Sequence, residues 1–249
     1  MLNNKKQKKI NYQPINLNYY YKLIDMLNKK YIFRLFSNFN ENENYVILRH
    51  DVDLSIHAAV KLANFEYDKG IISTYFINIH SKFYNTFEKI IMDYIKDIIN
   101  YRHKIGLHFD FNLYNINDKE ELEKYLEKEK NILEDIFEQS IDVFSFHNPN
   151  SIIINKYSNY YYSGMINTYS EYFMKKVYYC SDSTGIWKND NLDKVLKEKN
   201  IKWVQVLTHP VWWTNKKNMT PFEKIMYAIN GRAENTKQHT LKNKSYKEN

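Results

Sequence analysis

Two aspartates one residue apart end an apolar run in the segment YVILRHDVDLS, residues 45–55. Side chains alternate between the two faces of a strand, so Asp51 and Asp53 are expected to point the same way. Two carboxylates on one face repel each other and lose hydration unless a cation or a proton lies between them. The pattern predicts either a metal ligand beside a general base at the carboxyl end of a strand, or a solvated turn.

The segments that must position these residues alternate between short apolar strands and helical stretches. The expected strands are 45–50, 71–78, 104–109, 141–147, 177–183 and 201–209, and the expected helices are 55–70, 83–101, 117–137, 189–200 and 220–230. Ser55 is expected to cap the start of the first helix, Gly70 to follow its end, and Asn117 to cap the third. The tyrosine-rich residues 151–173 are expected to be irregular. This alternation indicates a parallel β/α architecture.

Chemistry in parallel β/α folds collects at the carboxyl ends of the strands. Five of the six expected strands end in residues that titrate or bind metals, which are His50, Asp51 and Asp53; His108 and Asp110; His147; Asp182; and His209. Endings of this kind on five strands favour one shared site over unrelated loop tips.

The order and spacing of these motifs over residues 45–213 resemble the polysaccharide deacetylases of the NodB-homology type, a carbohydrate esterase superfamily. The motif RHDVD is similar to the HDVD-type variant found in surface-polysaccharide biosynthesis, and implies Asp51 as the catalytic base and Asp53 as a metal ligand. The motif HKIGLHFDFN implies His108 as a second ligand, and it has Asn112 where the family usually has another histidine. The resemblance implies an α/β fold, a distorted (β/α) barrel with about seven parallel strands.

The third ligand is left open by this departure, because neutral Asn is a poorer zinc ligand than imidazole. In FSFHNP, His147 stands where the family usually has an arginine, and we interpret it as the replacement ligand. His147 could instead orient the base as that arginine does, and Asp110 or Asn112 could complete the ligand set.

The last two motifs imply an acid and a sugar-binding surface. In SDSTGIW and VQVLTHPVWW, His209 takes the place of the catalytic acid, and Asp182 would hold it charged or fix its tautomer. The residues expected to contact substrate are Asp110, Trp187, Trp212 and Trp213. The implied cofactor is a divalent metal, Zn²⁺ first, with Co²⁺, Ni²⁺, Mn²⁺ or Fe²⁺ as alternatives. Such a metal polarises a carbonyl and lowers the pKa of bound water toward about 7.

Structural roles are the alternatives for these residues. They are Asp53 as a turn or cap residue, His108 as a core histidine, His147 as an outer hydrogen-bond partner or substrate contact, His209 as an inert strand end, and Trp212 or Trp213 as core. His50 has the opposite strand parity to the aspartates and is expected to pack. His103 is expected at the other end of its strand, and Cys180 in the core.

Composition bounds the class of protein. The 249 residues are 43% hydrophobic and 26% charged, which suits a folded chain divided into a basic, helical extension (1–44), a barrel (45–231) and a disordered basic tail (232–249). The net charge of +7 gathers at both ends without a nucleic-acid-binding motif, so nucleic acid is not an expected partner. A single cysteine, no membrane-length apolar run and no secretory signal favour the cytoplasm.

The function expected from these features is metal-dependent removal of an N-acyl group, acetyl in particular, from a sugar in cytoplasmic surface-glycan biosynthesis. A nucleotide- or lipid-linked sugar fits that location. The alternative is a catalytically silent glycan-binding or scaffold protein on the same fold, which Asn112 in a ligand position keeps open. The oligomeric state is not predicted.

Overall fold

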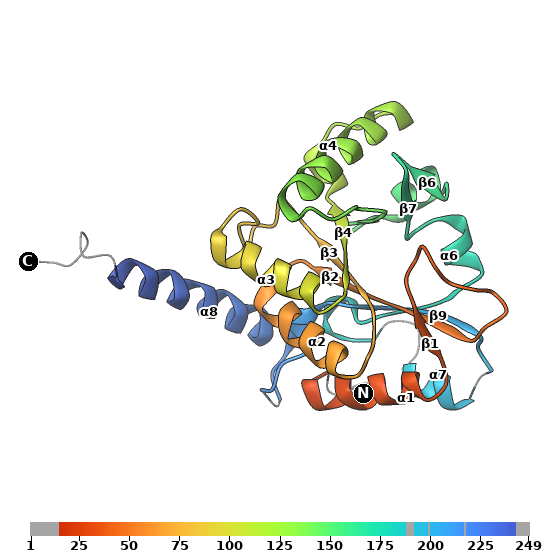
Figure 1. Cartoon of the computed structure of the whole chain (residues 1–249), viewed down its shortest axis with the longest axis horizontal. Helices are drawn as coiled ribbons and strands as arrows, with labels where there is room; N and C mark the ends of the chain where they lie inside the picture. The colour runs from red at the N-terminus through yellow and green to blue at the C-terminus, as the bar shows by residue number, and fades with distance from the viewer. Residues whose placement is uncertain (1–14, 188–191, 199, 217, 243–249) are drawn as a thin grey trace, which may run out of the picture.

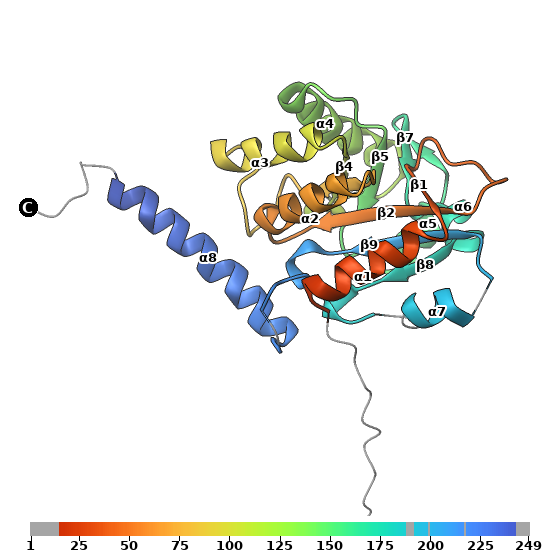
Figure 2. The ribbon, with the colours of Figure 1, turned by 60° about the horizontal axis from the view of Figure 1, so that its bottom comes forward.

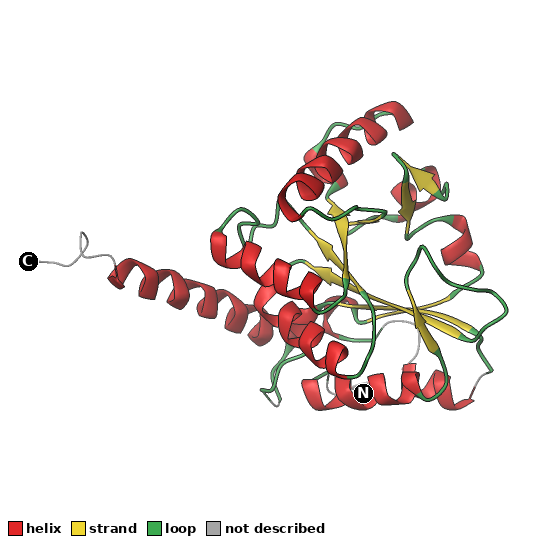
Figure 3. Cartoon of the chain, in the orientation of Figure 1, coloured by secondary structure: helices red, strands yellow, loops and turns green. Residues whose placement is uncertain are grey.

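A curled, mostly parallel sheet with helices along its outer side makes up the fold (Figure 1 and Figure 3). The computed structural model describes residues 15–187, 192–198, 200–216 and 218–242. Within them the strand order is β6-β7-β5-β4-β3-β2-β9-β8, with β1 paired to β2. Every described strand pair is parallel except β6 with β7. The expected distorted (β/α) barrel is confirmed, with eight strands in parallel pairs rather than about seven.

The strands are β1 (Ile32–Arg34), β2 (Tyr45–Val52), β3 (Thr74–Ile77), β4 (Lys104–Phe109), β5 (Val143–Phe146), β6 (Tyr161–Tyr162), β7 (Met165–Asn167), β8 (Tyr178–Ser181) and β9 (Trp203–Thr208). The helices are α1 (Leu17–Asn28), α2 (Ile56–Asp68), α3 (Lys89–Asn100), α4 (Lys119–Phe137), α5 (Ser151–Lys156), α6 (Glu171–Lys175), α7 (Leu192–Glu198) and α8 (Pro221–Lys242). Short 3₁₀ turns are η1 (Phe111–Leu113), η2 (Ser183–Gly185) and η3 (Pro210–Trp212). The helix expected at 189–200 includes positions 189–191 and 199, which lie outside the described residues.

Strand β2 is central, and all eight of its residues are buried. It pairs with β9 on one side, and with β1 and then β3 on the other. Tyr45 and Ile47 join a core cluster with Phe76, and by alternation the same face carries Arg49 and Asp51. Burial on both sides explains the near-continuous apolar run of this strand. Arg49 and Asp51 therefore lie next to an apolar core, at the carboxyl end of β2.

Helix caps follow the sequence closely at α2 and less closely at α4. The Ser55 hydroxyl accepts a hydrogen bond from the Ala58 amide at 3.1 Å, and Gly70 has φ +69°, as expected for the two ends of α2. The cap of α4 is Asp118, not the predicted Asn117, because the Asp118 carboxylate accepts from the Glu121 amide at 2.9 Å. Glu121 in turn accepts from the backbone of Asn117 at 2.7 Å.

The segment 151–173 is more regular than predicted. It holds α5, α6 and a hairpin of β6 and β7, whose two-residue turn is Ser163 and Gly164 with φ +47° and +73°. Two positive φ angles are the geometry of a tight hairpin turn. Strands of two and three residues are too short to leave a periodic signal.

Residues on both sides of the predicted barrel segment continue its structure. Helix α1 contributes five buried residues, and β1 pairs with β2, so residues before 45 share the core. Helix α8 continues to Lys242 and extends from the body (Figure 2). Residues 232–242 are thus helical rather than the expected disordered tail. Arg232 pairs with Glu88 and Gln238 bonds Glu234 one turn earlier, and both contacts favour the helix. None of the described helices is long and apolar enough to cross a membrane.

A buried carboxylate holds α1, α2 and the sheet together. Glu66 is fully buried and accepts hydrogen bonds from the hydroxyls of Tyr20, Ser73 (2.7 Å) and Tyr75 (3.1 Å). The His50 ring lies 3.1 Å from Glu66 Oε1, the oxygen that Tyr20 also contacts, and contacts Thr208 at 2.6 Å. His50 is thus buried and packed on the outer face of β2, as its parity predicts.

Replacing Glu66 with Gln should lower the free energy of unfolding by about 3 kcal/mol at pH 7, because an amide offers one acceptor to several donors. Burial alone would raise the pKa of Glu66, but His50 and the other hydrogen-bond partners lower it to about 2. The stabilisation is complete above the unfolded pKa of about 4.3 and is lost as pH falls toward 2. Urea unfolding at pH 7 and pH 3 measures both effects. Glu127→Gln, at an exposed position of α4, is the control and should change little.

Candidate metal centre and active site

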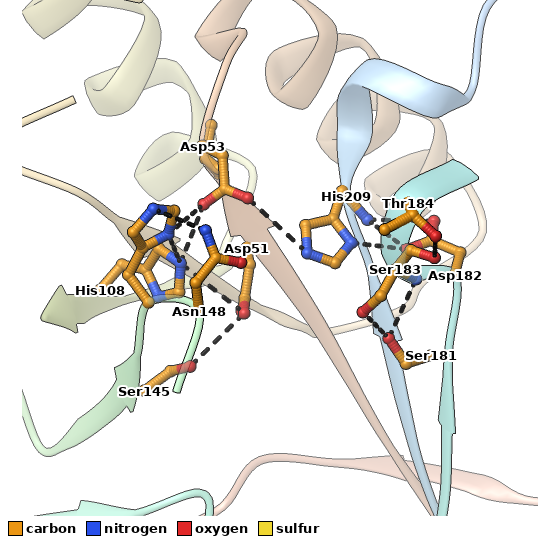
Figure 4. Close-up of polar contacts among 12 residues, drawn as sticks. Asp51, Asp53, His108, Ser145, Asn148, Ser181, Asp182, Ser183, Thr184 and His209 are labelled. Carbon is orange, nitrogen blue, oxygen red and sulfur yellow. Dashed lines mark hydrogen bonds and ion pairs between the residues drawn. The ribbon is translucent and has the colours of Figure 1, made fainter. Parts of the chain in front are cut away.

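Three side chains from three strands converge on one point at the carboxyl end of the sheet. Asp53 Oδ1 lies 2.9 Å from His108 Nε2 (Figure 4). It lies 3.1 Å from His147 Nδ1, and the two nitrogens are 3.2 Å apart. Ligands about 2.0–2.1 Å from a tetrahedral ion are separated by about 3.3 Å. The triangle therefore has the size that a divalent ion such as Zn²⁺ requires. The described residues contain no other group of three or more His, Cys, Asp or Glu side chains with this proximity.

The electrostatics of the triangle suit a cation. Burial alone would raise the pKa of Asp53, but hydrogen bonds from His108 and His147 hold it well below its usual range. Asp53 is therefore an anion at neutral pH, as a ligand for a cation would need to be. Two imidazole nitrogens 3.2 Å apart cannot both carry a proton toward each other, and a metal ion satisfies both lone pairs.

The strand order explains why these residues meet. Strand β4 lies between β3 and β5, and His108 is in register with Ser145 of β5, two residues before His147. His147 thus stands beside His108, one residue past the end of the neighbouring strand β5. Asn112, the alternative ligand, is exposed on η1, where its backbone amide donates to Asp110 at 3.1 Å.

Asp51 is held by an arginine that the sequence analysis did not single out. Arg49 donates to both Asp51 oxygens, at 3.1 and 2.8 Å, and both side chains are buried. The guanidinium also contacts the hydroxyls of Ser145 (2.5 Å) and Tyr169 (3.2 Å). Burial alone would raise the pKa of Asp51, but Arg49 lowers it below its usual range. Strand alternation could have indicated this pair, because Arg49 is two residues before Asp51 and lies on the same face of the strand.

Replacing Arg49 with Met should destabilise the protein by about 3–5 kcal/mol at pH 7, because the Asp51 charge would stay buried without a partner. The loss should shrink in acid, since the pKa of Asp51 would rise and the carboxyl would become neutral. Denaturant unfolding across pH measures this. Asp51→Asn in the Arg49→Met background should recover part of the loss, and an unchanged loss would mean that packing, not charge, explains it.

A second acid–base pair faces the triangle. His209 Nδ1 lies 2.6 Å from Asp182 Oδ1, and the His209 amide and Trp213 Nε1 also donate to this carboxylate, the latter at 2.9 Å. Burial alone would lower the pKa of His209, but the Asp182 charge raises it to about 9. His209 Nε2 points back across the site and lies 3.7 Å from Asp53 Oδ2 (Figure 4). The site can therefore present a protonated imidazole to a group bound at the triangle.

The two adjacent tryptophans expected to contact a sugar are buried. Trp212 and Trp213 are only 6% and 3% exposed, because both pack into the core around α1 and η3. Trp213 instead anchors Asp182. Trp187 is half-buried against Trp213, with ring centroids 6.0 Å apart. Asp110 is half-buried at the start of η1, and its substrate role stays a prediction.

No protein-family model matches the sequence, and neither does any curated protein. Several solved structures of carbohydrate esterase family 4 are similar to the chain. A pseudoenzyme of that family from Bacillus anthracis aligns at 15% identity and TM-score 0.44, over 79% of this chain and 63% of its own. A family 4 acetyl xylan esterase from Clostridium thermocellum, in complex with a cobalt ion, aligns at 11% and 0.45, over 77% and 84%. A peptidoglycan deacetylase from Bacillus subtilis aligns at 12% and 0.45, over 82% and 96%. The chain thus spans less than two thirds of the pseudoenzyme, and identities and TM-scores this low do not assign it to a family.

Proposed function

We propose that this chain is a metal-dependent hydrolase that removes an acyl group, N-acetyl in particular, from a sugar. The observation that carries the proposal is the three-ligand triangle of Asp53, His108 and His147 with the His209–Asp182 pair opposite it. Three protein ligands with an open position are typical of catalytic rather than structural metal sites. An acid facing that position suits cleavage of a bond whose leaving group needs a proton.

Each residue has a role that follows from its surroundings. The triangle would hold a divalent ion, Zn²⁺ or alternatively Co²⁺, Ni²⁺, Mn²⁺ or Fe²⁺, which supplies a Lewis acid for an acyl carbonyl. Asp51, fixed by Arg49, is ionised and placed to accept a proton, and its Oδ2 lies 3.8 Å from His108 Nε2. His209, kept charged by Asp182, is placed to donate a proton to the leaving nitrogen. General acid or base catalysis of this kind is worth about 10²–10⁴ in rate.

The proposed substrate is a nucleotide- or lipid-linked sugar handled in the cytoplasm during surface-glycan biosynthesis. A groove of about 940 Å³, which neither the triangle nor His209 lines, would have to hold the carrier of a linked sugar. Leu54 and Val211, which follow Asp53 and His209 closely along the chain, line it together with apolar side chains of α2, α3 and α8. Exposed Lys61 and Lys216 also line the groove and suit the phosphates of a carrier.

A catalytically silent glycan-binding or scaffold protein is the second candidate. The observation that favours it is the Arg49 pair, because a carboxylate with a lowered pKa is a weaker proton acceptor. Under this alternative the metal would be structural or absent, and Asp51 would serve only to neutralise Arg49.

Acetate release separates the two candidates. Protein freed of metal by chelation and reloaded with Zn²⁺ or Co²⁺ is offered a nucleoside-diphosphate N-acetylhexosamine and a chitin oligosaccharide. Metal-dependent acetate release, lost in Asp51→Asn while metal content is kept, supports the hydrolase. Stoichiometric metal without release of acetate supports the binding protein. A folded protein that takes up no divalent metal overturns the proposal.

A further inference from the structure

We propose that Asn148 is the outer hydrogen-bond partner of His147, and that its side-chain oxygen supports the tautomer in which the triangle binds a divalent metal. The inference rests on the metal site proposed above, but not on the reaction. Asn148 is a positioning residue, since it acts through His147 and not on a substrate.

Both nitrogens of the His147 ring have polar neighbours. Nδ1 faces the triangle, 3.1 Å from Asp53 and 3.2 Å from His108. Nε2 lies 3.0 Å from the side-chain amide of Asn148. The ring is therefore held between the metal site on one side and one amide on the other.

A neutral imidazole carries one N–H, and the partner of one nitrogen decides the state of the other. When Asn148 turns its NH₂ toward Nε2, that nitrogen accepts, and Nδ1 carries the hydrogen and donates it to Asp53. In this arrangement the Nδ1 hydrogen points into the triangle, so Nδ1 cannot bind a cation. A metal needs the lone pair of Nδ1, so Nε2 must then carry the hydrogen and donate it.

The Asn148 carboxamide can hydrogen-bond either tautomer of His147, because rotating it by half a turn exchanges its nitrogen and oxygen. Its oxygen and nitrogen have nearly the same shape, and which one faces the ring is assigned from the hydrogen-bond network. With its oxygen toward Nε2, the same side chain accepts the N–H of the metal-binding tautomer. Histidine ligands of metals usually have such an outer acceptor, and its loss weakens affinity by about 10–100-fold.

Two features make Asn148 the decisive outer partner. Its φ is +45°, a left-handed conformation that Asn tolerates better than most residues, and the turn brings the side chain back over the residue before it. The other ligand histidine lacks such support, because His108 Nδ1 is buried without a hydrogen-bond partner among the described residues. Asn148 is solvent-exposed, which places its effect at the lower end of that range.

Cobalt titration of metal-free protein, followed by visible absorption, tests the inference without an activity assay. Asn148→Gly fits the left-handed backbone and removes the amide, and should raise the Kd for Co²⁺ about tenfold. Asn148→Asp can only accept, and should bind at least as tightly as the wild type. Asn218→Gly, at an exposed asparagine with φ +61°, is the matched control and should leave the Kd unchanged.

Histidine ¹⁵N NMR of the metal-free proteins reports the tautomer directly. The wild type should carry the His147 hydrogen on Nδ1, and Asn148→Asp should move it to Nε2. Equal Kd values for wild type and Asn148→Gly, or an unchanged tautomer in Asn148→Asp, overturn the inference and leave the proposed hydrolase standing. A wild type that binds no Co²⁺ overturns both.

Discussion

Replacing Asp53 with Asn is expected to remove the metal from the purified protein and to reduce acetate release to background. Asp53 Oδ1 is the corner of the triangle that touches both histidines, and it is the only negatively charged ligand. An amide oxygen of the same shape has no net charge to balance a divalent ion. Because losing an outer partner alone costs about 10–100-fold in affinity, losing the ligand itself should cost more than about 100-fold. Metal content after dialysis and Co²⁺ titration measure the loss.

Asp110→Asn is the control for this experiment. Asp110 follows His108 by two residues and lies at the same end of the sheet, but it caps η1 and is not a corner of the triangle. The Asp110 variant should keep its metal. Loss of metal in Asp110→Asn with retention in Asp53→Asn would show that the ligand set is wrong and that Asp110 completes it.

Local sequence patterns predicted which polar residues end or follow the strands, and three of them, Asp53, His108 and His147, lie together in the structure. The parity of Asp51 and Asp53, and the single polar residues that end the other strands, depend only on alternation and on the parallel arrangement. His147 could be considered as a ligand because Asn112 left a place unfilled. Its position beside His108 became certain only with the β4–β5 register.

The parts that were not predicted depend on contacts between distant residues. Arg49 contacts Ser145 and Tyr169, which lie 96 and 120 residues later in the chain, and these contacts could not be predicted without the folded sheet. Strand alternation alone places Arg49 on the same face as Asp51. Trp213 is aromatic and lies near His209, features shared by a sugar platform and by a buried anchor. Burial alone distinguishes them, and burial depends on α1, far away in the sequence. Residues 232–242 are another example. Their polar composition gave no helical signal, and the ion pair that favours their helix joins Arg232 to the distant Glu88.

Replacing Asp182 with Asn should lower kcat/KM about 100-fold or more and move the alkaline limb of the pH profile downward. His209 must be protonated to act as the acid, so activity is lost as pH rises through its pKa. In the wild type that pKa is raised to about 9 by Asp182, and burial without the carboxylate would bring it to the ordinary 6.5 or below. Asp53 Oδ2 lies 3.7 Å from His209 Nε2, and a divalent ion bound by Asp53 would lower the His209 pKa in both proteins, so the shift between them is the quantity predicted.

Trp213→Phe separates charge from packing in this test. It removes the indole donor to Asp182 but leaves the carboxylate beside His209, so it should cost less than about tenfold and leave the limb in place. The ion pair also affects stability in a defined direction. Because the folded pKa of His209 is raised, its stabilisation is present below about pH 6.5 and is lost as pH rises through 9. An Asp182→Asn enzyme with the wild-type alkaline limb would mean that another group is the acid, whereas a lowered limb with retained metal ties proton donation to the His209–Asp182 pair.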